Sequence, residues 1–296
     1  MTKKLIMAGL ILLAASSCSN ESENTTINDE TLVPVCVHVN DFSVSQQDLP
    51  VTRANTAVTA YAGIKGMTLA FYKTDGTLQY SASQQRATMP GGKTFGEFSL
   101  SLPMGSYTMV VLAYGSNFPM TLNSMAEAVF DTQEARVRET FIAKQTVDVT
   151  TNSARDLTAT LSRVISKLQL NSSDGRIADV KNVRMTFSAG GQAVNPLTGF
   201  ATTNAGFSNT VSVSADPGTT SSSVSYLFLA TDEQTMNVTI ETLDADGNPL
   251  FSKTVNDVPF KRNRLTQLTG KMYTSDVTAV TFEVNDEWLD DASVNF

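Results

Sequence analysis

The chain has 296 residues, a formal net charge of −8, one histidine and two cysteines. This acidic balance disfavours nucleic acid and bare anionic membrane as partners, and no basic patch interleaved with aromatic residues is present. Charged residues make up only 17% of the chain while serine and threonine are abundant, which is typical of an extracellular β-protein rather than of a helical cytosolic enzyme.

The N-terminus has the pattern of a bacterial lipoprotein signal. Lys3 and Lys4 form a positive n-region, residues 5–15 form an apolar h-region, and small residues precede Cys18. The apolar run is shorter than the roughly 20 residues that a transmembrane helix needs. We therefore expect residues 1–17 to be a signal peptide and Cys18 to carry lipid such as palmitate. An ordinary secretory signal that ends near a cysteine is the alternative.

The region after the signal is long enough for two domains, with a single long β-domain as the alternative. It begins with residues 18–30, which are polar and acidic and predict a flexible tether. Residues 33–39 then alternate between valine and other residues, which predicts a half-buried strand. The valines on its apolar face are Val33, Val35, Val37 and Val39. Cys36 then lacks a disulfide partner, and His38 is expected on the surface rather than on a metal.

Further strands are predicted through the first half of the chain. Residues 66–72 and 77–80 are joined by a stretch that contains Asp75 and Gly76, a strong hairpin signal. Residues 98–102 alternate again, and residues 107–114 are apolar enough to lie in the middle of a sandwich.

One helix is expected to interrupt the strands. Ser124 and Glu127 have the spacing of a capping box, which predicts a short helix that starts there. Strands resume from Phe141. In the second half, the segments that we expect to be strands are residues 164–170, 180–187, 226–230, 236–243 and 250–255. Residues 190–216 are expected to form long loops around short edge strands.

The residues that could carry chemistry form no catalytic arrangement. No histidine lies in a usable pattern with serine or cysteine, and neither a phosphate-binding glycine loop nor a cysteine cluster is present. Acidic residues gather at 283–291 without the ligand order of a calcium loop, so we read them as a solvated edge. We interpret the basic residues at 261–264 as exposed and Trp288 as a core residue. The sequence therefore predicts a protein that is not an enzyme and has no metal or cofactor.

Several segments, taken in their order along the chain, resemble the fimbrillin family, the subunits of type V pili of Gram-negative anaerobes. They are residues 49–54 after the first strand, 161–168 at the domain join, the 244–249 hairpin, 258–270, and the closing 280–288. The resemblance implies an all-β fold of two tandem transthyretin-like β-sandwich domains with one or two short helices, over residues 54–162 and 163–296. It also implies export as a lipoprotein, with display at the outer membrane and in a fimbrium on the cell surface.

The resemblance also implies a maturation step. In polymerising members an arginine-specific protease cleaves the loop after the first strand, and the vacated groove accepts a strand from a neighbouring subunit. Arg53 and Ala54 match the cleavage position, which makes residues 31–53 a candidate propeptide. Val280, Phe282 and Val284 repeat the period-two apolar face of the lost valines, so this segment is a candidate donor strand.

The favoured function is a structural and adhesive subunit of a surface pilus, whose partners are other fimbrial subunits, the outer membrane through the lipid, and a host protein or glycan. A lipid-retaining anchor or a tip subunit is one alternative. A surface glycan-binding lipoprotein is another. Paired exposed aromatic residues would favour the glycan-binding protein, but the loops at 87–96 and 190–216 offer phenylalanine and no tryptophan or tyrosine.

Overall fold

The computed structural model describes residues 32–43, 55–134, 136–150, 153–273 and 283–285. The regular structure of these residues is almost entirely β, so the all-β prediction is confirmed. Two single-turn 3₁₀ helices, η1 (Arg86–Thr88) and η2 (Thr132–Glu134), accompany the strands. In the part of the chain that the structure describes, no helix is long and apolar enough to cross a membrane.

The first half folds around one eight-stranded sheet with the order β2-β1-β10-β9-β6-β3-β4, in which β5 also pairs with β1. Its strands are β1 (Leu32–Ser43), β2 (Asn55–Ala57), β3 (Gly66–Lys73), β4 (Leu78–Gln85), β5 (Glu97–Pro103), β6 (Gly105–Tyr114), β9 (Thr140–Val149) and β10 (Arg155–Arg163). A separate hairpin of β7 (Met120–Ser124) and β8 (Glu127–Phe130) packs beside this sheet.

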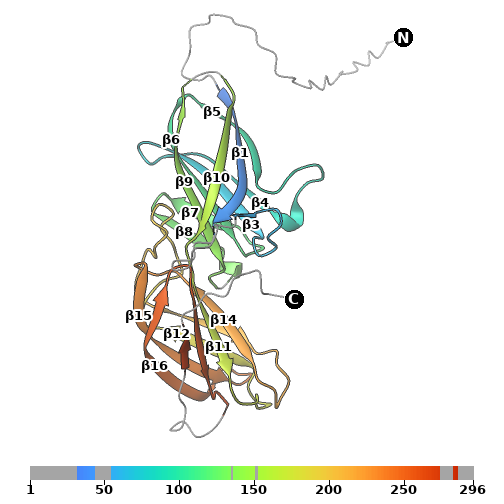
Figure 1. The fold of residues 1–296 in the computed structure, drawn as a ribbon, viewed down its shortest axis with the longest axis vertical. Coiled ribbons are helices and arrows are strands. Elements are labelled where there is room, and N and C mark those ends of the chain that lie inside the picture. The colour runs from blue at the N-terminus through green and yellow to red at the C-terminus, as the bar shows by residue number, and fades with distance from the viewer. Residues whose placement is uncertain (1–31, 44–54, 135, 151–152, 274–282, 286–296) are drawn as a thin grey trace, which may run out of the picture.

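The second half contains two four-stranded sheets, β14-β11-β17-β18 and β13-β12-β15-β16. Their strands are β11 (Ser166–Ser172), β12 (Asn182–Phe187), β13 (Phe207–Ser212), β14 (Ser222–Leu227), β15 (Glu233–Leu243), β16 (Pro249–Lys261), β17 (Leu265–Gly270) and β18 (Glu283–Asn285). The two halves lie end to end along the long axis of the molecule (Figure 1).

Buried apolar side chains form three clusters. One fills the first half and includes the β1 valines, and one lies between the two sheets of the second half. The third cluster contains residues of both halves, with Tyr72 and Leu112 on one side and Ile165 and Phe228 on the other. The halves therefore share a continuous apolar contact rather than a solvated linker.

The β3–β4 hairpin confirms the prediction from Asp75 and Gly76. Gly76 adopts a φ of 85°, a conformation that glycine reaches without steric cost. The Asp75 carboxylate accepts a hydrogen bond from the amide of Thr77 at 2.8 Å. The turn residues therefore close the hairpin through their own backbone and side chains.

The short helix predicted at Ser124 and Glu127 is wrong, because these residues flank the turn between β7 and β8. The Ser124 hydroxyl accepts the amide of Ala126 at 3.0 Å, which satisfies a β-turn instead of a helix N-terminus. Met120 and Leu122 are buried two residues apart, the period of a strand. Packing of this apolar face overrides the local capping signal.

Candidate functional site

The first strand, β1, is paired along both of its edges. Leu32–His38 run antiparallel to β5, with Val37 opposite Phe98. From Val35 onward the strand also runs parallel to β10, and its last three residues pair with β2. Removal of β1 would therefore leave two strands, β5 and β10, without their common partner.

The four valines of β1 point into the core of the first half. Val33, Val35 and Val37 are 0% exposed and Val39 is 2% exposed, which confirms the predicted alternation. Cys36 and His38 lie on the opposite face and are half-buried, and Cys36 is a free thiol. The His38 imidazole lies 3.9 Å from the Glu97 carboxylate, and at this exposure such a pair contributes little stability.

The other predicted site residues are distributed differently. Cys18, Arg53, Ala54, Val280 and Phe282 lie outside the described residues. Val284 belongs to β18, whose backbone pairs antiparallel with β17 opposite Leu268. The last described strand is thus at the edge of a sheet in its own second half. Within the described ranges, no group of three or more histidine, cysteine, aspartate or glutamate side chains could hold a metal ion.

Arg86 fastens the turn that follows β2. Its guanidinium donates to four backbone carbonyl oxygens, those of Val58 (2.9 Å), Thr59 (3.1 Å), Tyr61 (3.2 Å) and Ile64 (2.9 Å). It also lies 4.3 Å from the centre of the Phe95 ring. Burial lowers the pKa of Arg86, but arginine stays charged because its pKa begins so high. Arg86 therefore holds residues 58–64, which follow β2, through hydrogen bonds that do not involve β1.

A second buried network starts from the same turn. The Tyr61 hydroxyl donates to the Glu139 carboxylate at 2.8 Å, and the same carboxylate forms an ion pair with Arg163 at 2.7 Å. Arg163 also donates to the side-chain oxygen of Asn263 at 3.3 Å. Because Asn263 lies between β16 and β17, the network joins the turn beside β1 to the second half. No sequence pattern identifies Arg86 or Arg163, since their hydrogen-bond and ion-pair partners lie 22 to 100 residues away.

The amino-acid sequence matches the model of one protein family. A family of unknown function, DUF6562, matches residues 37–295. No curated protein matches the chain.

Solved structures are similar to the chain at low sequence identity. A putative adhesin from Bacteroides ovatus is 11% identical with a TM-score of 0.51, over 88% of this chain and 97% of that one. A second putative adhesin from the same species is 11% identical with a TM-score of 0.49, over 81% and 88%. The fimbrial anchor protein Mfa2 from Porphyromonas gingivalis is 10% identical with a TM-score of 0.44, over 86% and 95%. The likeness with a TM-score of 0.51 shows a shared fold, and at 11% identity it concerns the fold alone.

Proposed function

Because the chain belongs to the DUF6562 family, whose function is unknown, we propose its function from the first strand. We propose that the protein is a structural subunit of a surface fimbria, exported as a lipoprotein and assembled by strand exchange after proteolysis. The observation that carries the proposal is β1, a strand buried on one face, paired on both edges and followed in sequence by Arg53.

The energetics of β1 support a cleavage-driven assembly. Burial of four valine side chains contributes roughly 1.5 to 3 kcal/mol each, and their sum is comparable to the roughly 5 to 15 kcal/mol that holds a domain together. Loss of β1 would expose an apolar groove and two unpaired strand edges. A strand from another subunit would restore both, which is β-augmentation between chains.

The fold comparison and the resemblance of the sequence agree with a role in adhesion. The solved structure with a TM-score of 0.51 is described as a putative adhesin, and the segments noted above resemble fimbrillins. The partners that follow are other fimbrial subunits and the outer membrane, the latter through a lipid on Cys18.

The N-terminus of surface-extracted protein tests the proposal most directly. We expect the assembled protein to begin at Ala54. Loss of residues 18–53 removes six acidic residues and one arginine, so the charge should move by five units toward neutral on an isoelectric gel. Arg53→Lys should block an arginine-specific protease, while Arg155→Lys is the matched control. Mature protein that begins at Cys18 would contradict assembly after cleavage at Arg53 and indicate a lipid-retaining anchor.

Lipid attachment is tested at the other end of the same segment. Cys18→Ala should abolish labelling of the precursor by a fatty-acid probe and release the protein from the membrane, because each buried methylene contributes about 0.8 kcal/mol to anchoring. Cys36→Ala is the control and should label normally. Unchanged labelling of the Cys18→Ala protein would end the lipoprotein assignment.

The donor strand is tested at Phe282. Phe282→Asp should place a charge in the neighbour's groove and block polymerisation while the monomer still folds, and Thr281→Asp on the opposite face should have a smaller effect. SDS-resistant ladders that persist in the Phe282→Asp protein would refute the role of this segment. Collapse of the monomer would instead assign the segment to its own sheet, as the pairing of β18 with β17 suggests.

A further inference from the structure

A polar cleft lies in the second half, where it is lined by residues of β13 and β14. These are the edge strands of the two sheets, and residues 136–138 of the first half line the same cleft. The cavity measures 420 Å³, within the roughly 300 to 1,000 Å³ of small-molecule sites. The residues that define the polar cleft here are Arg136, Arg138, Asn209, Ser223, Ser225 and Tyr226.

Polar residues occupy core positions in both strands of the cleft. Alternation along β13 turns Asn209 inward, and alternation along β14 turns Ser223 and Ser225 inward. All three side chains are buried, with Asn209 only 2% exposed. Burial of polar groups costs stability where apolar residues would fit. Packing alone therefore does not explain why Asn209, Ser223 and Ser225 occupy these positions.

Asn209 leaves one polar atom for a ligand. Its amide nitrogen donates to the Ser225 hydroxyl at 2.6 Å, while its side-chain oxygen has no partner among the described residues. If the amide were turned over, Ser225 could donate instead and the nitrogen would be unpaired. In either orientation the cleft offers an unsatisfied hydrogen-bonding group.

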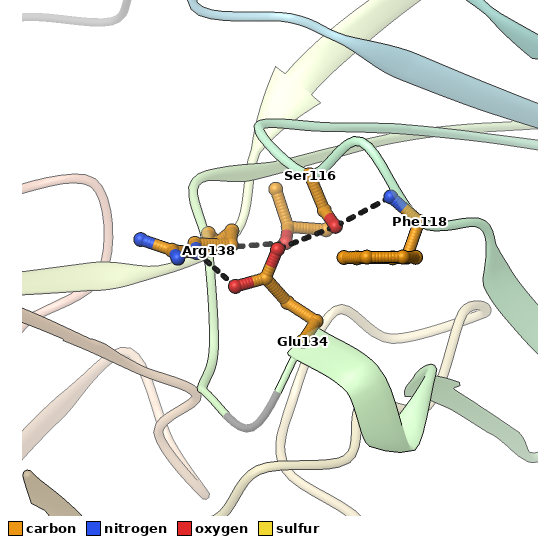
Figure 2. A network of polar contacts seen from close by, with 5 residues as sticks. Ser116, Phe118, Glu134 and Arg138 are labelled. Atoms are coloured by element: carbon orange, nitrogen blue, oxygen red, sulfur yellow. Dashed lines mark hydrogen bonds and ion pairs between the residues drawn. The ribbon is translucent and has the colours of Figure 1, made fainter.

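The two arginines of the cleft differ in their charge balance. Arg138 forms an ion pair with Glu134, a buried carboxylate that also accepts the Ser116 hydroxyl at 2.6 Å (Figure 2). Arg136 forms no ion pair with any residue in the described ranges. Burial and then the nearby charge of Arg138 lower the pKa of Arg136, against the attraction of Glu134. A bound anion would supply the missing counter-charge.

We propose that the polar cleft binds an acidic monosaccharide unit such as a uronic or sialic acid. The Arg136 guanidinium holds the carboxylate, because arginine forms the strongest hydrogen bonds to this group. Asn209 and the serine hydroxyls hold the sugar hydroxyls, which both donate and accept hydrogen bonds. This assignment is independent of strand exchange, since the cleft contains no residue of β1.

Titration calorimetry on the folded protein near neutral pH tests the charge in the ligand. We expect glucuronic acid or N-acetylneuraminic acid to bind and the methyl ester of glucuronic acid, which lacks only the charge, to bind about tenfold more weakly or not at all. Arg136→Gln should weaken binding of the acid by about tenfold or more. The exposed Lys93→Gln is the matched control for one lost positive charge and should bind normally.

Three results would overturn the proposal. Equal binding of the acid and its methyl ester would show that the charge of the ligand plays no role. Equal binding of the acid to the natural protein and to the Arg136→Gln protein would show the same for the charge of Arg136. N-acetylaspartate that binds as tightly as glucuronic acid would show that the sugar hydroxyls contribute nothing, and would indicate a peptide carboxylate instead.

Asn209→Leu separates a binding role from a structural one. A leucine of similar size removes the unsatisfied oxygen but also leaves the Ser225 hydroxyl without its partner. These two effects oppose each other, so the variant should unfold at a temperature close to that of the natural protein and yet bind glucuronic acid about tenfold more weakly. A variant that loses stability and keeps its affinity would show that Asn209 serves the fold alone.

Discussion

At the scale of single residues, two buried tyrosines in the same cluster have opposite hydrogen-bonding states. The Tyr114 hydroxyl contacts Thr68 at 3.1 Å and accepts from Gln85 at 3.3 Å. The Tyr72 hydroxyl has no partner in the part of the chain that the structure describes. Both side chains are almost fully buried, so the difference lies in their polar atoms rather than in their packing.

This contrast predicts opposite effects of the same substitution. Tyr72→Phe should stabilise the protein by roughly 1 kcal/mol, because it removes a buried hydroxyl without a partner. Tyr114→Phe should destabilise it by roughly 1 kcal/mol, because it leaves Thr68 and Gln85 with fewer partners. Urea unfolding of the two variants checks this. Equal losses in both would show that the Tyr72 hydroxyl is satisfied in solution.

Both tyrosines also make stability depend on alkaline pH. Burial raises the pKa of Tyr72 and of Tyr114 above the ordinary value of 10.0. Their contribution to stability is therefore complete below pH 10 and is lost as pH rises from there through the folded pKa, because the unfolded chain ionises first. Between about pH 9 and pH 11, the urea midpoint of the double variant Tyr72→Phe with Tyr114→Phe should decrease less than that of the natural protein. An equal decrease in both proteins would contradict the assignment of this pH dependence to the two tyrosines.

At the scale of elements, β1 shows what a period-two pattern of apolar residues can and cannot predict. The alternation of valines was sufficient to predict which face is buried, because side chains of a strand alternate whatever its neighbours are. The partners of β1 could not be predicted in the same way. Its pairing with β5 on one edge and β10 on the other depends on contacts far apart in sequence.

The buried face of β1 should be sensitive to a single hydroxyl. Val37→Thr keeps the shape of the side chain and buries an unpaired polar group, so we expect a loss of about 1 to 3 kcal/mol in the free energy of unfolding. Leu32→Thr, at a position 60% exposed, should change it by less than about 0.5 kcal/mol. Similar effects at both positions would mean that β1 is not held in the core in solution.

Hairpins and helices differed in how well local sequence predicted them. The Asp75–Gly76 turn forms as expected because the turn residues themselves impose the backbone conformation. The capping pattern at Ser124 failed because the same hydroxyl can accept an amide in a β-turn, and the apolar residues around it have the period of a strand. The polar cleft was missed because its residues come from three separate segments.

At the scale of the whole molecule, Glu139 and Arg163 lie where the two halves meet. The Arg163 side chain is 0% exposed and that of Glu139 is 11% exposed, and the Arg163 guanidinium lies 5.0 Å from the centre of the Phe141 ring. The division into domains at residues 54–162 and 163–296 stays a prediction. The apolar cluster shared by both halves indicates that they pack against each other.

The ion pair at this junction should show strong coupling. Arg163→Met leaves a buried carboxylate without its cation and should cost about 3 to 5 kcal/mol in unfolding free energy. The double variant Arg163→Met with Glu139→Gln should cost much less than the sum of the two single variants, because no uncompensated charge remains. Additive losses in a double-mutant cycle would show that the pair does not form.

The parallel pairing of β1 with β10 also has a consequence for the time course of folding. Val35 is opposite Arg155, a residue about 120 positions later, and contacts of such long range make β-proteins slow to fold. The first strand to be synthesised must wait for β10 before most of its second edge is covered. During that delay its second edge stays open to chaperones, proteases and neighbouring chains, so the order of synthesis would leave β1 incomplete for longer than any other strand of the first half.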